Sequence, residues 1–478
     1  MNPVEEFPQL QSRADLESWQ TERLRALLAE VLSRNRFWQS KFGAAGISAV
    51  DVRSLADLQK IPLTTKAEIL ADQASRPPYG TNLTYEVAAY SRLHQTSGTT
   101  GTPLRWLDTP RSWDWILQTW QQLFGLMGLR RDDRLLFPFS FGPFLGFWAG
   151  FEGANRLGNL CIAAGGMSSQ ARLNLLRDNQ ATVVCCTPTY AMRLAEVAAE
   201  LQIDLKGTGV RAILVAGEPG GNIPSTRRRI ESAWGAQVVD HWGMTELGPL
   251  AIESLDRPGG LYVLETACIA EIIDPQTAAP VACGDEGELV ITNLGRTGSP
   301  LIRYRTGDRV RAGVPTEFGA TDTGNVTPPN PPLTKGGSEV FPPLARVGQG
   351  GSRDDVISPS LLLHIPGGIL GRIDDMLTIR GNNLYPAALE EVIRQFDGVA
   401  EFRIELRTVK AMQHVRMEIE PNAALGASDV TSLITQVGDT IKTRWHFQAE
   451  VIAVAPGSLP RFEMKARRFF RDGHPTTQ

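Results

Sequence analysis

The middle of the chain alternates short apolar runs with amphipathic stretches. The runs "ATVVCCTP" (181–188), "GVRAILVAG" (209–217) and "AQVVDHWG" (236–243) are apolar on successive residues, as in strands covered on both faces. Between them, "TYAMRLAEVAAEL" and "STRRRIESAWG" have the spacing of helices. This alternation predicts a parallel α/β sheet, in which ligands bind beyond the carboxyl ends of the strands. The loops "AGEPGG" and "HWGMTE" follow two of these strands and should open onto a site.

The regions on either side of this sheet have different patterns. Residues 15–42 predict one amphipathic helix, whose apolar face is formed by Leu24, Leu27, Leu28, Val31 and Leu32. In residues 260–310, "LYVLETACIAEIID", "GELVITNL" and "PLIRYRTGD" predict strands of a smaller β subdomain.

From about residue 371 the pattern changes again. It predicts a strand at "DMLTIRG", a helix at "YPAALEEVIRQFDG" that begins near Pro386 and stops at Gly398, and half-buried strands at "EFRIELR" and "HVRMEIEP". A second helix ("SDVTSLITQVGDTIKTR") and a last strand ("AEVIAVA") follow. We therefore expect an α/β fold: a large N-terminal domain (1–371) with mixed or parallel sheets and a β subdomain, and a small, mobile α+β domain (372–478).

Residues 313–360 are rich in proline and glycine. The units "PPLTKGG" and "PPLARVG" resemble each other, and the stretch has too few apolar residues to form a core. We interpret it as a disordered insertion in the larger domain.

Composition narrows the classes of function. The net charge of -4, from 48 basic and 52 acidic residues, argues against a nucleic-acid or anionic-membrane surface. The N-terminus lacks the basic and apolar regions of a signal peptide, and no apolar run approaches the roughly 18 residues of a membrane span. Five scattered cysteines without a CxxC pair suggest reduced thiols in a cytoplasmic protein.

Five short motifs are candidates for chemistry, and each has an ordinary structural alternative. "TSGTTGT" (96–102) could cradle phosphates with its backbone amides, although it lacks the lysine of a Walker loop and could equally be a hairpin turn. Trp242 could stack on a flat ring, and Thr245 and Glu246 offer the oxygen atoms that Mg²⁺ prefers. Asp308 in "RYRTGD" could bind a ribose, or could simply occupy a turn.

The last two motifs lie near and beyond the predicted domain boundary. Arg372 could bind phosphate or ribose, and Asp374 lies where a hinge is expected; a charged linker is the alternative. Lys465 lies in "LPRFEMKARR", which could be no more than a basic surface tail.

The order of the motifs along the chain resembles that of the adenylate-forming enzymes, and within them the phenylacetate–CoA ligase branch. The similarity is carried by "TSGTTGTPLR", "AGEPGG", "DHWGMTELGP", "GELVITNL", "PLIRYRTGD", "GGILGRIDDMLTIRGNNLYP" and "LPRFEMKARR". It extends over nearly the whole chain except 313–360, and as a set these motifs are highly specific.

The resemblance implies a role for each matching residue. The ATP β- and γ-phosphates would be held by Ser97, Gly98, Thr99, Thr100 and Gly101. The adenine pocket would comprise Ala216, Gly217, Glu218 and Pro219, flanked by Asp240, His241 and Trp242. Trp242 stands where the family usually has tyrosine, so stacking is kept and a hydroxyl is lost.

For the reacting groups, the resemblance implies that Thr245 contacts the α-phosphate and that Glu246 binds Mg²⁺. Asp308 would bind the ribose and Arg372 the ribose or a phosphate. The hinge would be Asp374, the strand with Gly381 would line the coenzyme A channel, and Lys465 would reach the carboxylate and α-phosphate during adenylation.

The implied reaction is ATP-dependent activation of an aryl or arylacetic acid to an acyl-AMP, followed by thioester formation with coenzyme A. Transfer to a carrier protein's phosphopantetheine, or ligand binding without turnover, are the alternatives. The family also suggests a homodimer. A subset of "FPFSFGPFLGFWAG" around Phe141 and Gly142 could face the acid, although most of this stretch should be packed core. No cysteine follows Cys283, so we predict no structural zinc.

Overall fold

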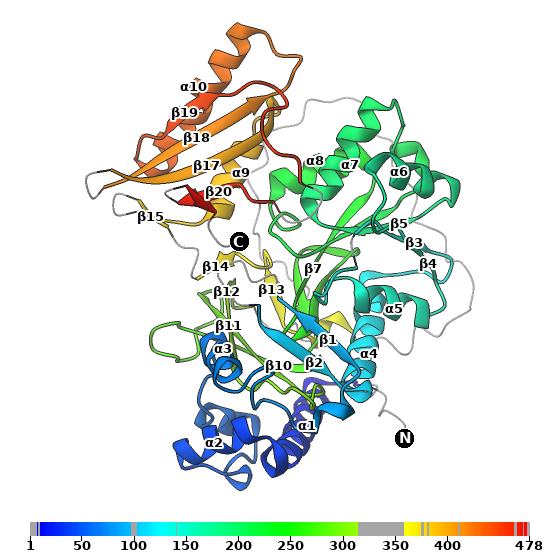
Figure 1. Ribbon diagram of the computed structural model, residues 1–478, viewed down its shortest axis with the longest axis vertical. Coiled ribbons are helices and arrows are strands. Elements are labelled where there is room, and N and C mark those ends of the chain that lie inside the picture. Colours follow the sequence, from blue (N-terminus) through cyan, green and yellow to red (C-terminus); the bar gives the residue numbers. More distant parts are fainter. Residues whose placement is uncertain are drawn as a thin grey trace.

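The computed structural model of the protein describes Phe7 and residues 10–96, 103–139, 141–313, 358–373, 377–379, 382–409, 412–462, 466–471 and 473–475. Its largest sheet has the strand order β13-β9-β8-β7-β6-β5-β3-β4 (Figure 1). These strands are β3 (Arg134–Phe137), β4 (Leu160–Ala163), β5 (Val183–Cys186), β6 (Ala212–Val215), β7 (Gln237–Met244), β8 (Gly248–Ser254), β9 (Arg257–Val263) and β13 (His364–Pro366). Strands β3 to β7 are parallel, whereas β8, β9 and β13 are antiparallel to their neighbours. The mixed α/β class predicted from the sequence is confirmed.

Helices cover both faces of the parallel strands. One face packs on α4 (Pro110–Met127) and α5 (Trp148–Arg156), and the other on α6 (Ser169–Asp178), α7 (Pro188–Glu200) and α8 (Pro224–Trp234). Successive residues of β5 point into different cores: Val183 and Cys185 into the first, Val184 and Cys186 into the second. Double coverage is the reason why these strands are apolar throughout. The predicted strands and helices of residues 181–243 are confirmed.

A second sheet has the order β10-β11-β12-β14 and contains β10 (Cys268–Ile273), β11 (Glu286–Asn293), β12 (Tyr304–Arg311) and β14 (Gly371–Arg372). The stretch 261–274 is not one strand, as we expected, because it divides between the two sheets. β9 ends at Val263, a buried turn closed by a hydrogen bond from Ala267 N to Leu264 O follows, and β10 then begins in the other sheet. The turn is as buried as the strands and contains no glycine or proline, so periodicity alone does not reveal it. A separate hairpin pairs β1 (Arg92–Gln95) with β2 (Arg105–Asp108).

The expected single N-terminal helix is two helices, α1 (Arg13–Arg34) and α2 (Arg36–Ala45), followed by α3 (Lys66–Ser75). Asn35 ends the first and caps the second: its backbone N–H donates to Val31 O, and its side chain accepts from Trp38 N. The side chain of this buried residue also donates to Asn82 and Thr84. An asparagine that satisfies these groups makes the break stable.

The C-terminal domain has a five-stranded sheet of order β19-β18-β17-β20-β21 and its own apolar core. Its elements are β15 (Leu377–Ile379), β16 (Asn382–Leu384), α9 (Pro386–Arg394), β17 (Val399–Val409), β18 (Met412–Pro421), α10 (Ala427–Trp445), β19 (Glu450–Ala453), β20 (Phe469–Arg471) and β21 (His474–Pro475). α9 begins at Pro386 as predicted but ends at Arg394, before Gly398. The carbonyl of Gly398 instead accepts from Asn422 N, which places Gly398 at the start of the β17–β18 hairpin.

The residues after Lys465 are not a surface tail. Ala466, Arg468 and Phe469 are buried, and β20 pairs in parallel with β17. The surface-tail alternative that we weighed for 459–468 is therefore wrong for Ala466 and Arg468.

Some predictions lie outside the described residues: those for Ser97, Gly98, Thr99, Thr100, Gly101, Asp374, Gly381 and Lys465, and that for residues 314–357. Pro359–Leu361, at the end of the predicted insertion, form a short 3₁₀ helix. Among the described helices, none combines the length and apolarity required to cross a membrane.

Candidate functional site

Trp242, Asp308 and Arg372 form a continuous polar cluster at the junction of the two sheets. The indole Nε1 of Trp242 donates to Asp308 Oδ2 at 2.8 Å, and Arg372 Nη1 lies 3.3 Å from Asp308 Oδ1. Asp308 and Arg372 are register partners on β12 and β14, which fixes the pair in the backbone. Gly307, at φ +75°, leaves room for the guanidinium, since a Cβ there would lie 2.7 Å from Arg372 Nη2. Three motifs far apart in the sequence thus meet here.

The indole N–H gives Trp242 a hydrogen bond that a purely aromatic stacking residue would lack. Trp242 is 8% exposed and Asp308 is 6% exposed, so the bond is shielded from water. It holds the ring and the carboxylate in one arrangement.

Glu246 supplies a buried carboxylate oxygen that has no hydrogen-bond partner among the residues that the structure describes. Its side chain is 3% exposed, and the oxygen concerned is Oε1. Lys66 Nζ, at the first residue of α3, lies 3.2 Å from Oε1, which is an ion-pair distance without hydrogen-bond geometry. Burial, followed by the charge of Glu246, raises the pKa of the Tyr304 phenol, while Arg372 opposes the shift and Asp308 adds to it. Tyr304 is therefore within electrostatic reach of both Glu246 and the Asp308–Arg372 pair.

The segment before Lys66 is fixed to the start of β12. The backbone of Thr64 exchanges hydrogen bonds with Arg303 O and Arg305 N, and its hydroxyl donates to Ile302 O. These hydrogen bonds hold the backbone next to Lys66 in place beside Glu246. Sequence reasoning missed this lysine because "TTKAEIL" is an ordinary helix start with a Thr65 cap and Glu68 capping box.

A buried ion pair supports the turn that carries Thr245 and Glu246. Arg296 donates to both carboxylate oxygens of Asp108, at 2.8 and 2.7 Å, and its third contact is to Thr245 O at 2.8 Å. Asn293 Nδ2 donates to Leu247 O at 2.7 Å. Burial alone would raise the pKa of Asp108, but the charge of Arg296 holds it below its ordinary value. No sequence pattern predicts this support, because Arg296 and Asp108 belong to no motif.

Asp240 precedes this region on β7 and lies close to the loop after β6. A Cβ on Gly221 would lie 2.4 Å from Asp240 Oδ1, so this position requires glycine. Burial, followed by the charge of Glu253, raises the pKa of Asp240 to about 7. The carboxyl group of Asp240 therefore gains or loses its proton near neutral pH.

The loop that follows β6 carries Ala216, Gly217, Glu218 and Pro219. Ala216 N donates to Cys186 O, and Gly217 adopts φ +93°. Glu218 accepts from two backbone amides, Thr189 N at 2.9 Å and Ala466 N at 2.7 Å. Both carboxylate oxygens are therefore engaged in contacts between segments of the protein.

His241 lies on the side of β7 that faces α4. Its ring is 4.6 Å from that of Trp120, and Nδ1 lies 2.8 Å from Ala251 O. Because a carbonyl only accepts, Nδ1 carries the hydrogen; burial lowers the pKa of His241 to about 4. The imidazole is neutral at pH 7 and is not brought into the Trp242–Asp308–Arg372 cluster.

Phe141 and Gly142 lie in an aromatic cluster on the same side of the sheet. Phe141 is 4.7 Å from Phe139 and 4.8 Å from Trp148, whose indole Nε1 donates to Gly142 O. A Cβ on Gly142 would lie 2.8 Å from Phe144. These contacts provide an apolar, aromatic environment without a charged group.

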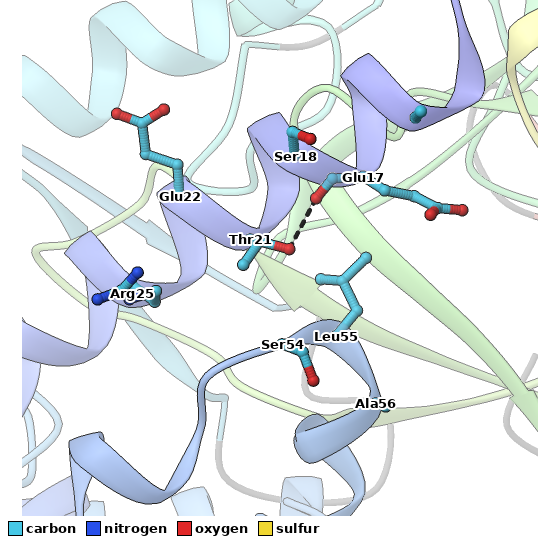
Figure 2. A pocket seen from close by; sticks show the side chains of 9 residues that line it. Glu17, Ser18, Thr21, Glu22, Arg25, Ser54, Leu55 and Ala56 are labelled. Carbon is cyan, nitrogen blue, oxygen red and sulfur yellow. Dashed lines mark hydrogen bonds between the residues drawn. The ribbon is translucent and has the colours of Figure 1, made fainter.

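One hollow among the described residues lies away from these groups. It has a volume of about 800 Å³ and lies between α1 and the segment 54–56, lined by side chains including Glu17, Thr21 and Arg25 (Figure 2). In Figure 2 its charged side chains do not converge on one point. We therefore place the candidate site at the carboxyl end of β7 and the start of β12.

Comparisons with known proteins give the family of the chain. The sequence model of the AMP-binding enzyme family matches residues 89–296, and that of the AMP-binding enzyme C-terminal domain matches residues 381–472. The phenylacetate-coenzyme A ligase of Escherichia coli (strain K12) is 29% identical over 463 residues, covering 95% of this chain and 94% of the relative. That of Pseudomonas putida is 28% identical, covering 94% of this chain and 93% of the relative.

Among solved structures, 2-hydroxyisobutyryl-CoA ligase in the postadenylation state with 2-HIB-AMP has a TM-score of 0.83 and 26% identity, covering 97% of this chain and 91% of that chain. The same ligase with 2-HIB-AMP and CoA in the thioesterification state has a TM-score of 0.66 at 26% identity, covering 99% of this chain and 95% of that chain.

The matched regions and the shared fold show that this chain belongs to the AMP-binding enzymes. Within that class it is an AMP-forming acid–thiol ligase, which activates a carboxylic acid with ATP to an acyl-AMP and transfers the acyl group to coenzyme A.

Proposed function

We propose that the acid is an aryl or arylacetic acid of the phenylacetate type. The observation that carries this proposal is similarity to phenylacetate ligases along almost the whole chain. The apolar cluster around Phe141 and Gly142 supports it, since an aromatic acid needs an apolar surround of this kind. Transfer to a carrier protein and binding without turnover are not favoured by these relatives.

In our proposal the Trp242–Asp308–Arg372 cluster holds the nucleoside. Asp308 accepts from the ribose hydroxyls, and Arg372 offsets charge at the ribose or a phosphate. The backbone of the loop 216–219 and Asp240 border the adenine, on which Trp242 stacks, while the Glu218 carboxylate is taken up by Thr189 N and Ala466 N. The phosphate loop (Ser97, Gly98, Thr99, Thr100 and Gly101), the hinge at Asp374, the coenzyme A channel at Gly381 and the lysine at Lys465 remain predictions from the family resemblance.

The residues present fit a magnesium ion bound with ATP. Glu246 offers a buried oxygen without a hydrogen-bond partner, which is the donor that a hard cation prefers. Thr245 contributes a hydroxyl to the α-phosphate beside it. When bound, Mg²⁺ offsets the negative charge of the triphosphate. We add Lys66 to this set as a second cation, since it already stands beside Glu246 and the Ser/Thr/Gly loop has no lysine of its own.

These groups define what the chain does in each half-reaction. Arg296 and Asn293 keep the Thr245–Leu247 turn in place, so the phosphate contacts are preorganised. Lys465 then offsets the charge that develops as the acid's carboxylate attacks the α-phosphorus and pyrophosphate leaves. In the second half-reaction, the thiolate of coenzyme A attacks the acyl carbonyl, and AMP leaves.

ATP–pyrophosphate exchange tests this function. We expect exchange with phenylacetate and substituted aryl acids, and much less with short aliphatic acids. Preference for a small hydroxy acid would instead favour the substrate class of the structural neighbour, and no exchange with any acid would contradict an adenylating role. Coenzyme A and a loaded carrier protein can be compared as acceptors in the same assay.

We also propose that the enzyme acts in the cytoplasm, where its five cysteines, all free of disulfides, would stay reduced. The homodimer suggested by the family remains a prediction, which sedimentation velocity can test.

A further inference from the structure

Several polar contacts join the C-terminal domain to the rest of the protein. Its apolar core is separate from the two cores of the larger domain. Glu391 Oε2 accepts from Ser225 N and Oγ, and Arg229 donates to the carbonyls of Phe396 and Val399. Beside these contacts lies a cavity of about 560 Å³ with lining residues from both domains. An interface without a continuous apolar core depends on a few hydrogen bonds for its orientation.

Glu218 is the residue that ties the end of the chain to the central sheet. It follows β6, and its carboxylate accepts from Thr189 N, in the first turn of α7, and from Ala466 N. Bonds from amides to a carboxylate are charge-assisted, and the helix N-terminus adds a favourable partial charge. One half-buried side chain thus joins two segments that are 248 residues apart in sequence.

A second contact fixes the same segment two residues further on. Arg468 donates to Thr189 Oγ1 at 3.3 Å, while Glu401 holds its guanidinium at 2.7 and 3.0 Å. Glu401 and Arg468 are both buried, and burial together with this pairing fixes the guanidinium in the C-terminal domain. Glu218 and Thr189 therefore bind residues 466–468 through these hydrogen bonds.

The orientation of the domains in this structure corresponds to one catalytic state. The TM-score is 0.83 against the ligase neighbour in its postadenylation state and 0.66 against that neighbour in its thioesterification state. The Glu218 contacts thus belong to a domain arrangement that is closer to the neighbour's postadenylation state than to its thioesterification state.

We propose that Glu218 is a positioning residue for adenylation: it docks the start of segment 466–471 on the first turn of α7 and thereby sets the C-terminal domain for the first half-reaction. The inference rests on the proposed function, because the residue that precedes Ala466 is Lys465, whose role comes from the family resemblance. Glu218 acts through the chain that it holds and takes no part in the bond changes.

Hydrogen exchange of the full-length protein without ligands tests the contact independently of activity. In Glu218→Gln, one carboxylate oxygen becomes an amide NH₂, which cannot accept from an N–H. We expect the peptide covering 466–471 to exchange about tenfold faster than in the wild type, as loss of a charge-assisted bond predicts. Unchanged hydrogen exchange in this peptide would overturn the proposal, irrespective of the substrate of the enzyme.

The half-reactions test the consequence. With phenylacetate as the acid, we expect Glu218→Gln to slow ATP–pyrophosphate exchange about tenfold while leaving thioester formation from supplied phenylacetyl-AMP and the affinity for AMP within about twofold. Glu391→Gln is the matched control, since it makes the same change in another carboxylate that bridges the domains. Its effect on exchange should be smaller, because Glu391 contacts α8 and not residues 466–468.

Two results would contradict the positioning role. If AMP affinity falls in proportion to exchange, Glu218 is an adenine contact. If Glu391→Gln matches Glu218→Gln, any interface contact suffices. Lys465→Ala, assayed in parallel, separates a failure of the proposed function from a failure of the inference. Normal ATP–pyrophosphate exchange in Lys465→Ala would refute the proposed role of the lysine. Loss of this exchange in Lys465→Ala, together with normal exchange in Glu218→Gln, would refute only the inference about Glu218.

Discussion

The Thr245–Leu247 turn and segment 466–471 both border the proposed site, and they are held in opposite ways. The turn is attached to Arg296, which is 1% exposed and paired with the equally buried Asp108. The segment is attached through half-buried Glu218 and one threonine hydroxyl at an interface with a cavity. A buried pair cannot be broken without a large cost, whereas an interface of single hydrogen bonds can open. We therefore call the Thr245–Leu247 turn with its support the permanent side of the site. Segment 466–471, with the preceding Lys465, is the exchangeable side.

The largest effect on this comparison should come from Lys465→Ala, on the exchangeable side. We expect adenylation to fall at least about a hundredfold, since a cation aimed at developing charge is lost. Thioester formation from a supplied acyl-adenylate should stay largely intact. Measuring the two half-reactions separately decides the matter, and equal loss of both would contradict the division of labour.

Asp108→Asn removes the charge that pairs with Arg296 on the permanent side. It leaves Arg296 buried without its anion, so we expect a loss of about 3–5 kcal/mol in the free energy of unfolding of the larger domain. Denaturant titration followed by tryptophan fluorescence measures it. A loss as small as that of a surface pair, such as Lys60→Ala beside Asp57, would show that the turn is not anchored as we describe.

Lys66→Ala should have an intermediate effect that falls on nucleotide binding. We expect the KM for ATP to rise about tenfold with kcat little changed, because a phosphate contact is removed, and Lys66→Arg should restore most of the affinity. Lys60→Ala, on the neighbouring 3₁₀ segment, is the matched control. If KM for ATP is the same in Lys66→Ala and the wild type, Lys66 serves only to neutralise Glu246.

Asp240→Asn tests how the stability of the site region depends on pH. Burial, followed by the charge of Glu253, raises the pKa of Asp240 from 3.8 to about 7, so the native state holds this proton more tightly than the unfolded state. The contribution of Asp240 to stability therefore falls as pH rises from about 4 to about 7 and is constant above that. Relative to the wild type, Asp240→Asn should be more stable at pH 8 than at pH 5 in urea titrations. A difference that does not depend on pH would contradict the raised pKa.

The smallest effect should come from deleting residues 314–357. The chain after this segment returns to Gly313 at β13, since a Cβ on Gly313 would lie 1.8 Å from His364 O. A short splice should therefore preserve turnover and the unfolding midpoint. Loss of either property would show that this segment contributes to one of the two sides of the site.

Prediction from sequence succeeded where the information is local. The apolar runs of β5, β6 and β7 and the helices between them follow from hydrophobic spacing, and they were placed correctly. It failed at the buried turn Leu264–Ala267 and at Asn35, because neither break contains a glycine or proline. It also missed the burial of Arg468, whose charge suggests a surface until Glu401 is seen beside it.

The sequence alone determined the class of fold, the order of the nucleotide-binding motifs and the family resemblance, because these depend on residue type and on spacing within one element. Only the tertiary structure decided that Lys66 faces Glu246, that Arg296 supports Thr245 and that Glu218 receives Ala466. Asp108 and Arg296 are 188 residues apart in the chain. Contacts of that kind depend on how whole elements pack and on which buried charges find a partner, and no local pattern specifies either.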